Sequence, residues 1–336
     1  MRKRALVAAS ALIACSAPAP TPASGSDSVP GSIVIDTCTI TTPTRWAAGA
    51  YTANCNIELQ STLTIDPGAT IAFGPGFSLN VGEAGVLTAV GTESSPIVFT
   101  SRKAGAAAGD WGCAGACGGV NLRGNGSTLE YVRVLYASSG VYVQGESVTI
   151  KSSTFAHNAG SGLVVDESFG GAMVSLNANT FFANGDYPLV LGRAVFIDGG
   201  SVFHDPENPQ VTNGKQCVSL DTNIDQLTVL GVTELGFLFG GHAISAEILL
   251  PPGTIFKSTS AAIELEKTGS LVNGPNATFT SAKDDALGGD CTGDGPSAPA
   301  SGDWEGLLIE DAAGTDYAAP ADYIRYAARS GTTHPH

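Results

Sequence analysis

The sequence predicts an all-β protein that is wound as a single-stranded right-handed parallel β-helix with a disulfide-tied N-terminal cap. Two observations predict this fold. Short alternating segments recur at intervals of roughly 20 to 26 residues, and the composition favours strands and turns over helices. Glycine accounts for 43 of the 336 residues, about twice its usual share, whereas only 14% of the residues are charged.

The clearest repeat relates residues 148–165 to residues 174–191. Each copy contains an alternating segment, a phenylalanine, an asparagine and a second short apolar segment. A repeat of this length is too short for a propeller blade and too rich in strands for helical repeats. It fits one β-helix coil of about three strands, with coils stacked about 4.8 Å apart. The equivalent Asn158 and Asn184 then either form an inward amide ladder or occupy two exposed turns.

A larger repeat relates the two ends of the chain. The first copy contains Leu63-Thr64-Ile65-Asp66-Pro67-Gly68, Phe99-Thr100-Ser101, Gly109-Asp110-Trp111 and Tyr131-Val132. The second copy contains Ile248-Leu249-Leu250-Pro251-Pro252-Gly253, Phe279-Thr280-Ser281, Gly302-Asp303-Trp304 and Tyr323-Ile324. We expect both Trp side chains to cover apolar core; the alternative is an exposed platform for sugar stacking.

This ordered set of motifs, together with Tyr187-Pro188, resembles secreted bacterial β-helix proteins of the pectate-lyase-like superfamily. Within that superfamily, the resemblance is to the large non-catalytic surface proteins. The resemblance covers about residues 57 to 328. It implies the architecture and does not imply a particular activity.

The N-terminus resembles that of bacterial lipoproteins. A basic stub, Arg2-Lys3-Arg4, precedes an apolar run that ends in Leu12-Ile13-Ala14-Cys15, which resembles a lipobox. We therefore expect residues 1–14 to be a signal peptide and Cys15 to carry the lipid; the alternative is an ordinary secretory signal. Residues 15–32 are rich in Pro, Ala and Ser and predict a flexible tether. A lipoprotein signal of this kind predicts that the protein lies outside the cell or on the outer membrane of a Gram-negative bacterium.

The remaining chain divides into three expected segments. Residues 33–56 form the N-terminal cap, residues 57–236 the first β-helix array, and residues 237–336 a second array that looks incomplete at its C-terminus. An open β-helix end exposes strand edges and core, which is why a cap is expected.

Six cysteines other than Cys15 would lie in an oxidising compartment. We expect a disulfide between Cys38 and Cys55 that ties the cap, contributing about 3 kcal/mol. A bond between Cys113 and Cys117 is a weaker expectation because its ring is small. The sequence leaves the pairing of Cys217 and Cys291 open.

The chain is acidic, with 16 Lys+Arg against 31 Asp+Glu. Such a surface repels nucleic acid and anionic lipid, so membrane contact is expected only through the lipid anchor. It also repels polyuronates unless calcium bridges them. A structural Ca²⁺ is expected at Asp290, Thr292 and Asp294, whose spacing resembles half of an EF-hand loop; the alternative is an ordinary acidic Gly-rich turn.

No catalytic residues are predicted. The acidic residues near the middle coils fall in loops and do not repeat in register, and they are Asp166, Glu167, Asp186, Asp198, Asp205 and Glu207. The bases near them are Arg133, Lys151 and Arg193. Gly241-His242 and Asp284-Asp285 faintly resemble polygalacturonase stretches, but in reversed order, so no role is assigned to them.

We therefore expect a surface-displayed, non-catalytic lipoprotein that serves as a structural, adhesive or glycan-binding module. Its partner would be an extracellular polysaccharide or another cell-surface component. The alternative is a polysaccharide lyase or glycoside hydrolase, which would show a groove with three or more converging carboxylates, or carboxylates together with Arg133 or Arg193.

Overall fold

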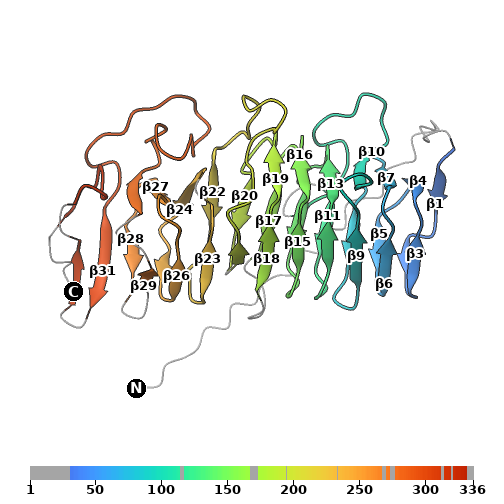
Figure 1. Cartoon of the computed structure of the whole chain (residues 1–336), viewed down its shortest axis with the longest axis horizontal. Helices are drawn as coiled ribbons and strands as arrows, with labels where there is room; N and C mark the ends of the chain where they lie inside the picture. Colours follow the sequence, from blue (N-terminus) through green and yellow to red (C-terminus); the bar gives the residue numbers. More distant parts are fainter. Residues whose placement is uncertain are drawn as a thin grey trace, which may run out of the picture.

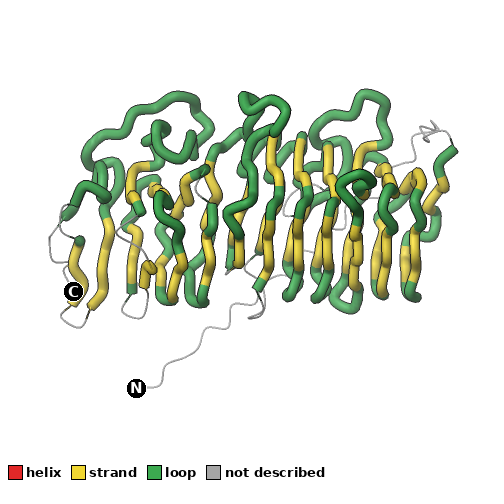
Figure 2. Tube along the Cα trace, in the orientation of Figure 1, coloured by secondary structure: helices red, strands yellow, loops and turns green. Residues whose placement is uncertain are grey.

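The computed structural model describes residues 31–113, 117–166, 173–193, 195–232, 234–266, 270–272, 277–311, 314–318 and 321–330. Cys15 and the predicted signal peptide lie outside the described residues. The described residues contain strands, turns and loops, and none of them forms a helix able to cross a membrane (Figure 2).

The strands form three long sheets and one short sheet, which we name A to D. Sheet A contains β1 (Ile33–Ile35), β4 (Gly49–Ala53), β7 (Ala69–Phe73), β10 (Ile97–Ser101), β13 (Val132–Leu135), β16 (Thr154–Ala156) and β19 (Thr180–Phe182). Sheet B contains β2 (Thr39–Ile40), β5 (Ile57–Leu59), β8 (Leu79–Val81), β11 (Val120–Leu122), β14 (Val141–Val143), β17 (Leu163–Val165), β20 (Leu189–Leu191), β22 (Cys217–Leu220), β24 (Gly236–Phe239), β27 (Ile255–Ser258) and β30 (Thr278–Ser281).

Sheet C contains β3 (Thr44–Trp46), β6 (Thr62–Ile65), β9 (Val86–Val90), β12 (Thr128–Glu130), β15 (Thr149–Lys151), β18 (Val174–Asn177), β21 (Val195–Ile197), β23 (Thr228–Leu230), β26 (Glu247–Leu249) and β29 (Ser270–Val272). Sheet D contains β25 (Ala243–Ile244), β28 (Ile263–Leu265), β31 (Leu307–Asp311) and β32 (Gly314–Tyr317).

The chain visits the sheets in turn, so successive strands of one sheet belong to successive coils (Figure 1). Neighbouring strands pair in parallel, except β31 and β32. Three longer loops, which contain residues 102–113 with 117–119, residues 203–216 and residues 282–303, extend along one edge of the solenoid (Figure 1). The predicted right-handed parallel β-helix is confirmed.

The interior consists of equivalent side chains stacked from coil to coil. Alternation in a strand points every second residue inward, and the three-residue strands of the middle coils accordingly bury their first and third residues. Phe155, Phe181 and Phe203 form one such stack, with ring centroids 5.2 and 5.4 Å apart.

The predicted asparagine ladder is confirmed. Asn158 Nδ2 donates to Asn184 Oδ1 at 2.8 Å, and Asn184 Nδ2 donates to Asn213 Oδ1 at 2.8 Å. All three side chains are buried at the corner between sheets A and B. The ladder satisfies polar groups that the turn of the chain would otherwise leave unpaired in the core.

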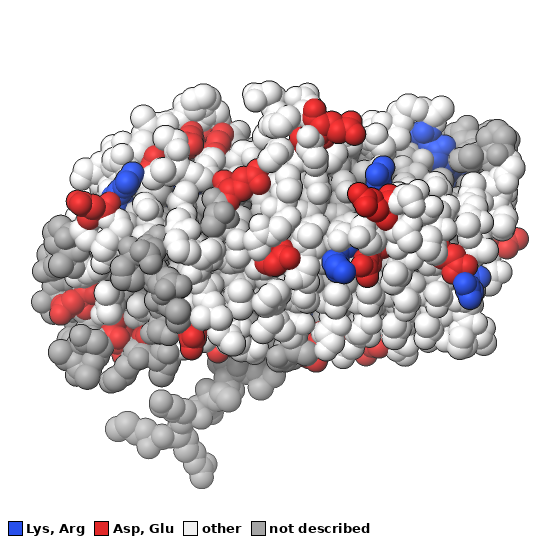
Figure 3. Space-filling model, viewed as in Figure 1, with Lys and Arg blue, Asp and Glu red and all other residues white. Residues whose placement is uncertain are grey.

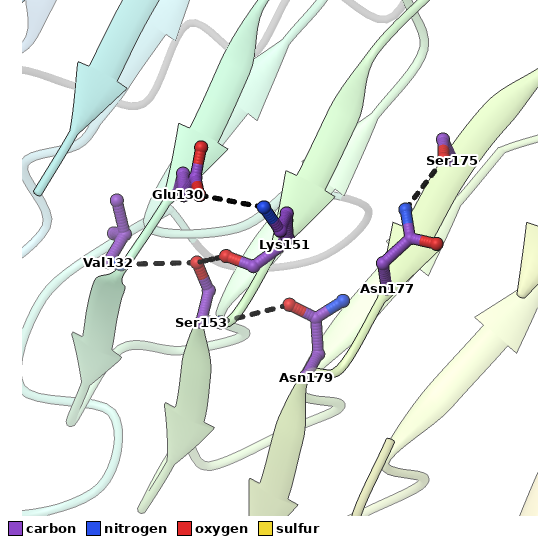
Figure 4. A network of polar contacts seen from close by, with 7 residues as sticks. All are labelled: Glu130, Val132, Lys151, Ser153, Ser175, Asn177 and Asn179. Carbon is purple, nitrogen blue, oxygen red and sulfur yellow. Dashed lines mark hydrogen bonds and ion pairs between the residues drawn. The ribbon is translucent and has the colours of Figure 1, made fainter. Parts of the chain in front are cut away.

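A second polar column lies at the corner between sheets C and A (Figure 4). Ser153 Oγ accepts the Val132 N–H at 3.1 Å, and Asn179 Oδ1 accepts the Ser153 N–H at 3.1 Å. On the outside of sheet C, Lys151 pairs with Glu130 at 3.0 Å. Side chains therefore bridge adjacent coils both inside and outside the corner.

The two large repeats share one hydrogen-bond arrangement. Asp110 accepts the Ala107 N–H and the Ser101 hydroxyl, and Asp303 accepts the Ala300 N–H and the Ser281 hydroxyl. The two tryptophans, Trp111 and Trp304, are buried, and each indole N–H donates to a backbone carbonyl at 2.7 Å. The interpretation of both tryptophans as core residues is confirmed.

The second repeat is rotated by one sheet relative to the first. The Phe99 strand β10 belongs to sheet A, whereas the equivalent Phe279 strand β30 belongs to sheet B. Among the described residues, sheet A ends at β19 and sheet D begins at β25, so the cross-section of the solenoid changes between them.

The segment expected as a cap contributes to the solenoid itself, because β1, β2 and β3 each add a strand to a different sheet. The predicted Cys38–Cys55 disulfide is present, with Cα atoms 5.9 Å apart, and it joins the first two coils. The structure also pairs Cys113 with Cys117, and it pairs Cys217 with Cys291, which the sequence had left open.

Candidate functional site on sheet B

One row of outward-facing residues runs the length of sheet B. The pairing register aligns Glu58, Asn80, Asn121, Tyr142, Val164, Val190, Ser219, Leu238, Lys257 and Thr280. Neighbouring members lie about 4.8 Å apart along the axis. Such a row presents equivalent positions at regular spacing, which suits contact with an extended repeating polymer.

Loops cover this row at two places. The loop that contains Cys113 lies against Asn121, which accepts the Gly118 N–H at 2.7 Å and is only 2% exposed. The loop of residues 282–303 covers Leu238, Lys257 and Thr280, which are all buried.

Several bonds hold the second loop on the sheet. The Cys217–Cys291 disulfide joins it to β22, and the Gly236 N–H donates to the Gly288 carbonyl at 2.8 Å. Lys257 Nζ donates to the Gly289 carbonyl at 2.5 Å. Burial lowers the Lys257 pKa to about 8.

Between these two loops the row is partly exposed at Tyr142, Val164, Val190 and Ser219. We call these four residues the sheet B window. The window combines an aromatic ring, two branched apolar side chains and a hydroxyl, so it offers a largely apolar contact surface with polar groups at its ends.

One rim of the window lies at the corner between sheets A and B. Lys215 forms an ion pair with Asp186 at 2.9 Å and lies 4.3 Å from the centre of the Tyr187 ring. Burial lowers the pKa of Lys215, but the bond to Asp186 and the Tyr187 contact outweigh burial and raise it. Burial raises the pKa of Tyr187. This rim holds a charged pair against an aromatic ring.

The opposite rim lies at the corner between sheets B and C. Gln144 Nε2 donates to Asp166 Oδ2 at 2.9 Å, and Arg193 donates to the Gly145 carbonyl at 2.5 Å. Burial lowers the pKa of Arg193, and the nearby Glu146 and Asp166 oppose that shift. The rim therefore gathers an amide, two carboxylates and one guanidinium.

The grouping of carboxylates and arginine that the enzyme alternative requires is present only in part. Arg193 lies near two carboxylates, those of Glu146 and Asp166. A lyase or hydrolase site would need such a combination of charged groups. Arg133 is exposed on sheet A, in another part of the molecule. The described residues contain no group of three or more His, Cys, Asp or Glu side chains placed to hold a metal ion.

The other predicted acids have local structural contacts. Asp198 accepts the backbone N–H groups of Ala178 and Gly200, and Asp205 accepts that of Glu207. Glu167 lies outside the described residues. His242 Nε2 lies 3.3 Å from Asp221, which directly follows β22, the strand that carries Ser219.

The predicted calcium ligands do lie together, in the loop that covers Lys257. Asp290 accepts the N–H groups of Thr292, Gly293 and Gly295, at 2.7 to 3.1 Å. The Thr292 hydroxyl contacts both Asp290 and Asp294. The acidic turn is thus closed by its own donors, which lower the Asp290 pKa against the opposing effect of burial. These contacts give the carboxylates partners other than a cation.

Sequence reasoning did not predict the window or the buried Lys257. The signal was available in part, because Tyr142, Val164 and Val190 are the middle residues of three equivalent short strands. On the face in Figure 3, charged side chains form separate small groups with broad uncharged areas between them.

Comparison with known proteins agrees with this fold. Residues 108–223 match the family model described as a right handed beta helix region. This match and the strand topology support a right-handed β-helix protein, and the matched segment contains all four residues of the sheet B window. No curated protein and no solved structure matched the chain.

Proposed function

We propose that the protein is an exported, non-catalytic binding module that holds an extended neutral polysaccharide against the sheet B window. The observation that carries this proposal is the partly exposed row Tyr142, Val164, Val190 and Ser219 between two covering loops. Its regular spacing along a rigid solenoid suits a polymer of repeating units. The apolar faces of sugar rings pack on aromatic and branched apolar side chains, while their hydroxyl groups bond to polar rims.

The charge of the protein favours a neutral polymer. The chain has a formal net charge of −15, and Asp166, Asp186 and Glu146 lie around the window. A polyuronate would meet this negative surface, whereas a neutral glucan, xylan or mannan would not.

Binding to oligosaccharides tests the proposal. Titration calorimetry with cellohexaose, xylohexaose and mannohexaose should detect binding of at least one, and oligogalacturonate should bind more weakly. Tyr142→Ala should weaken binding about tenfold, the upper end expected for one aromatic contact. Phe196→Ala is the matched control, because Phe196 is an exposed aromatic residue on sheet C.

Two arginine substitutions extend the test. Val164→Arg should block the window, whereas Val90→Arg, on the exposed surface of sheet C, should leave binding unchanged. Equal loss in both variants, or oligosaccharide binding that neither Tyr142→Ala nor Val164→Arg affects, would contradict the proposed site.

We also propose that a lipid on Cys15 anchors the module at the outer membrane, with residues 15–32 as a tether. The lipobox-like Leu12-Ile13-Ala14-Cys15 supports this. Mass spectrometry of the native protein should find an acylated Cys15 as the first residue, and Cys15→Ser should release the protein from membranes. A mature terminus downstream of Cys15 without lipid would show that the anchor is absent.

A polysaccharide lyase or hydrolase is the second candidate, and the observation that favours it is that Arg193 lies near the carboxylates of Glu146 and Asp166. An arginine whose pKa is lowered by burial is better able to act as a base. Incubation with pectins, alginates and glycosaminoglycans should then yield unsaturated products or new reducing ends. Turnover that Arg193→Lys or Asp166→Asn abolishes would replace the binding proposal with this one.

Calcium binding at Asp290, Thr292 and Asp294 is a third, separate proposal that rests on the sequence pattern. Calorimetry with Ca²⁺ should give heat that an Asp290→Asn/Asp294→Asn variant lacks. Absence of heat from the parent protein would leave the loop as a self-closed acidic turn.

A further inference from the structure

The N-terminal end of the solenoid is an incomplete layer of core. Strands β1, β2 and β3 each lie at the edge of their sheet, and within the described residues no strand pairs with their outer edges. Three short edges therefore present unpaired backbone donors and acceptors around one open end.

Ile33 shows that this end lacks a neighbouring layer. The register aligns Ile33 with Tyr51 and Ile71 in an interior stack. Tyr51 is 6% exposed and Ile71 is fully buried, whereas Ile33 is 59% exposed. An inward-facing isoleucine with this exposure has core on one side only.

A hollow of about 430 Å³ opens at the same end, and its apolar lining includes Ile35, Ile40, Trp46 and Tyr51. The rings of Trp46 and Tyr51 stack at 5.5 Å on its inner wall. Val34 on β1, which also borders the hollow, is 47% exposed. Exposed apolar side chains thus border a recess whose lining combines apolar residues with threonines and charged groups.

We propose that this end pairs with the same end of a second copy of the protein, through a two-fold axis perpendicular to the solenoid. Such an axis reverses the direction in which the chain circles the solenoid. It therefore sets β1 antiparallel to the β1 of the other copy, and β2 antiparallel to the other copy's β3. All three sheets continue across the contact. Ile33 of each copy then packs against the exposed core at the end of the other copy. An isologous contact of this kind closes at a dimer.

Charge complementarity favours a second copy over an unrelated strand. Asp36 follows β1 at the corner between sheets A and B. Arg45 lies on β3, and its side chain is 73% exposed while it pairs with Asp66 of its own copy at 2.9 Å. The two-fold operation brings the A–B corner of one copy to the C–A corner of the other. Asp36 of each copy then approaches Arg45 of the other, at both sides of the contact. Both residues line the hollow.

Sedimentation equilibrium of the mature chain tests the proposal, and a dimer is the expected species at micromolar concentration. Val34→Lys should shift the protein to monomer, because it places charge beside the paired edge. Phe196→Lys, on the exposed outer face of sheet C, is the control and should remain dimeric. A parent protein that sediments as a monomer overturns the proposal, including the case in which residues of its own chain cover this end.

A cysteine substitution keeps the test independent of effects on folding. Val34 is the middle residue of β1, so in the antiparallel pair it faces its own copy near the two-fold axis. Val34→Cys should form an intermolecular disulfide under mild oxidation, much faster than Val90→Cys, an exposed position on sheet C. Equal rates for the two variants would contradict the pairing. The proposed polysaccharide binding does not depend on this result.

Discussion

Asn158 and Asn184 lie one coil apart in the interior, and the amide of Asn158 donates to the side-chain oxygen of Asn184 at 2.8 Å. Asn184 in turn donates to Asn213 and to the Phe155 carbonyl. Both buried amides therefore connect adjacent coils, and each loses one hydrogen-bond partner if its neighbour is removed.

Asn184→Ala should destabilise the fold by about 3 kcal/mol, because it leaves several buried partners unpaired at once. Urea denaturation measures the change. Asn177→Ala is the control, since Asn177 bonds to Ser175 on the outer surface, and its cost should stay below about 1 kcal/mol. Equal losses in the two variants would show that the ladder carries no special stability.

Asp303→Asn should destabilise the protein by about 2 kcal/mol at pH 7. The Asp303 side chain is only 11% exposed, and the substitution replaces its charged hydrogen bonds with weaker neutral ones. The Ala300 N–H contributes most to lowering the folded pKa of Asp303, and Lys283 adds to it. This stabilisation is present above the ordinary value of 3.8 and is lost as the pH falls through the folded pKa.

Parent and Asp303→Asn stabilities should therefore converge in strong acid, as followed by denaturation at a series of pH values. Asp225→Asn, at an exposed position, is the control and should show little difference at any pH. A constant gap between the parent and Asp303→Asn down to the acid limit would exclude this origin of the effect.

Lys257→Met should stabilise the protein at pH 7, by at most about 3 kcal/mol, because it removes a buried ammonium group. The folded pKa of about 8 lies below the ordinary 10.5. The unfolded chain then binds the proton more tightly, so this group makes the parent's stability rise between about pH 8 and 10.5. The variant should lack that rise.

Lys215→Met is the matched control, because the folded pKa of Lys215 is raised and its ion pair with Asp186 is lost on substitution. At pH values below the ordinary lysine pKa, this substitution should destabilise the protein by a small amount. The Lys215 contribution to the parent's stability should fall as the pH rises, opposite to that of Lys257. A destabilised Lys257→Met protein whose stability still rises in that range would contradict the assigned cause.

Cys217→Ser should cost about 4 kcal/mol, because the bond to Cys291 spans 74 residues and restricts the unfolded chain strongly. Cys38→Ser should cost about 3 kcal/mol, since that bond spans only 17 residues. Hydrogen exchange should also show faster exchange in residues 282–303 for the first variant alone. Unchanged exchange there would mean that the loop stays on the sheet without the disulfide.

The sequence predicted the coils and the ladder because both follow from a repeat of fixed length. Asn158 and Asn184 are separated by 26 residues, as are the strands around them. Asn213 was missed because it follows Asn184 by 29 residues, across the loop 203–216, so its spacing departs from the repeat. Inserted residues hide a structural equivalence that the backbone retains.

The rotation of the second repeat and the limits of the window could not be predicted. The order of motifs around Phe99 and Phe279 is the same, yet which sheet receives each strand depends on how earlier coils end. Lys257 has the alternating position of an exposed strand residue, and only the folding of residues 282–303 over sheet B buries it. A loop that covers a strand distant in the sequence leaves no signal in the sequence around that strand.

Hydrogen exchange with and without a bound neutral hexasaccharide tests the central claim most directly. If the sheet B window holds the polymer, protection should increase in β14, β17 and β20 and in the rims at residues 186–187 and 215, with sheet C unchanged. Protection confined to sheet C or to the covering loops, or conversion of the hexasaccharide to shorter products, would contradict a non-catalytic binding site on sheet B.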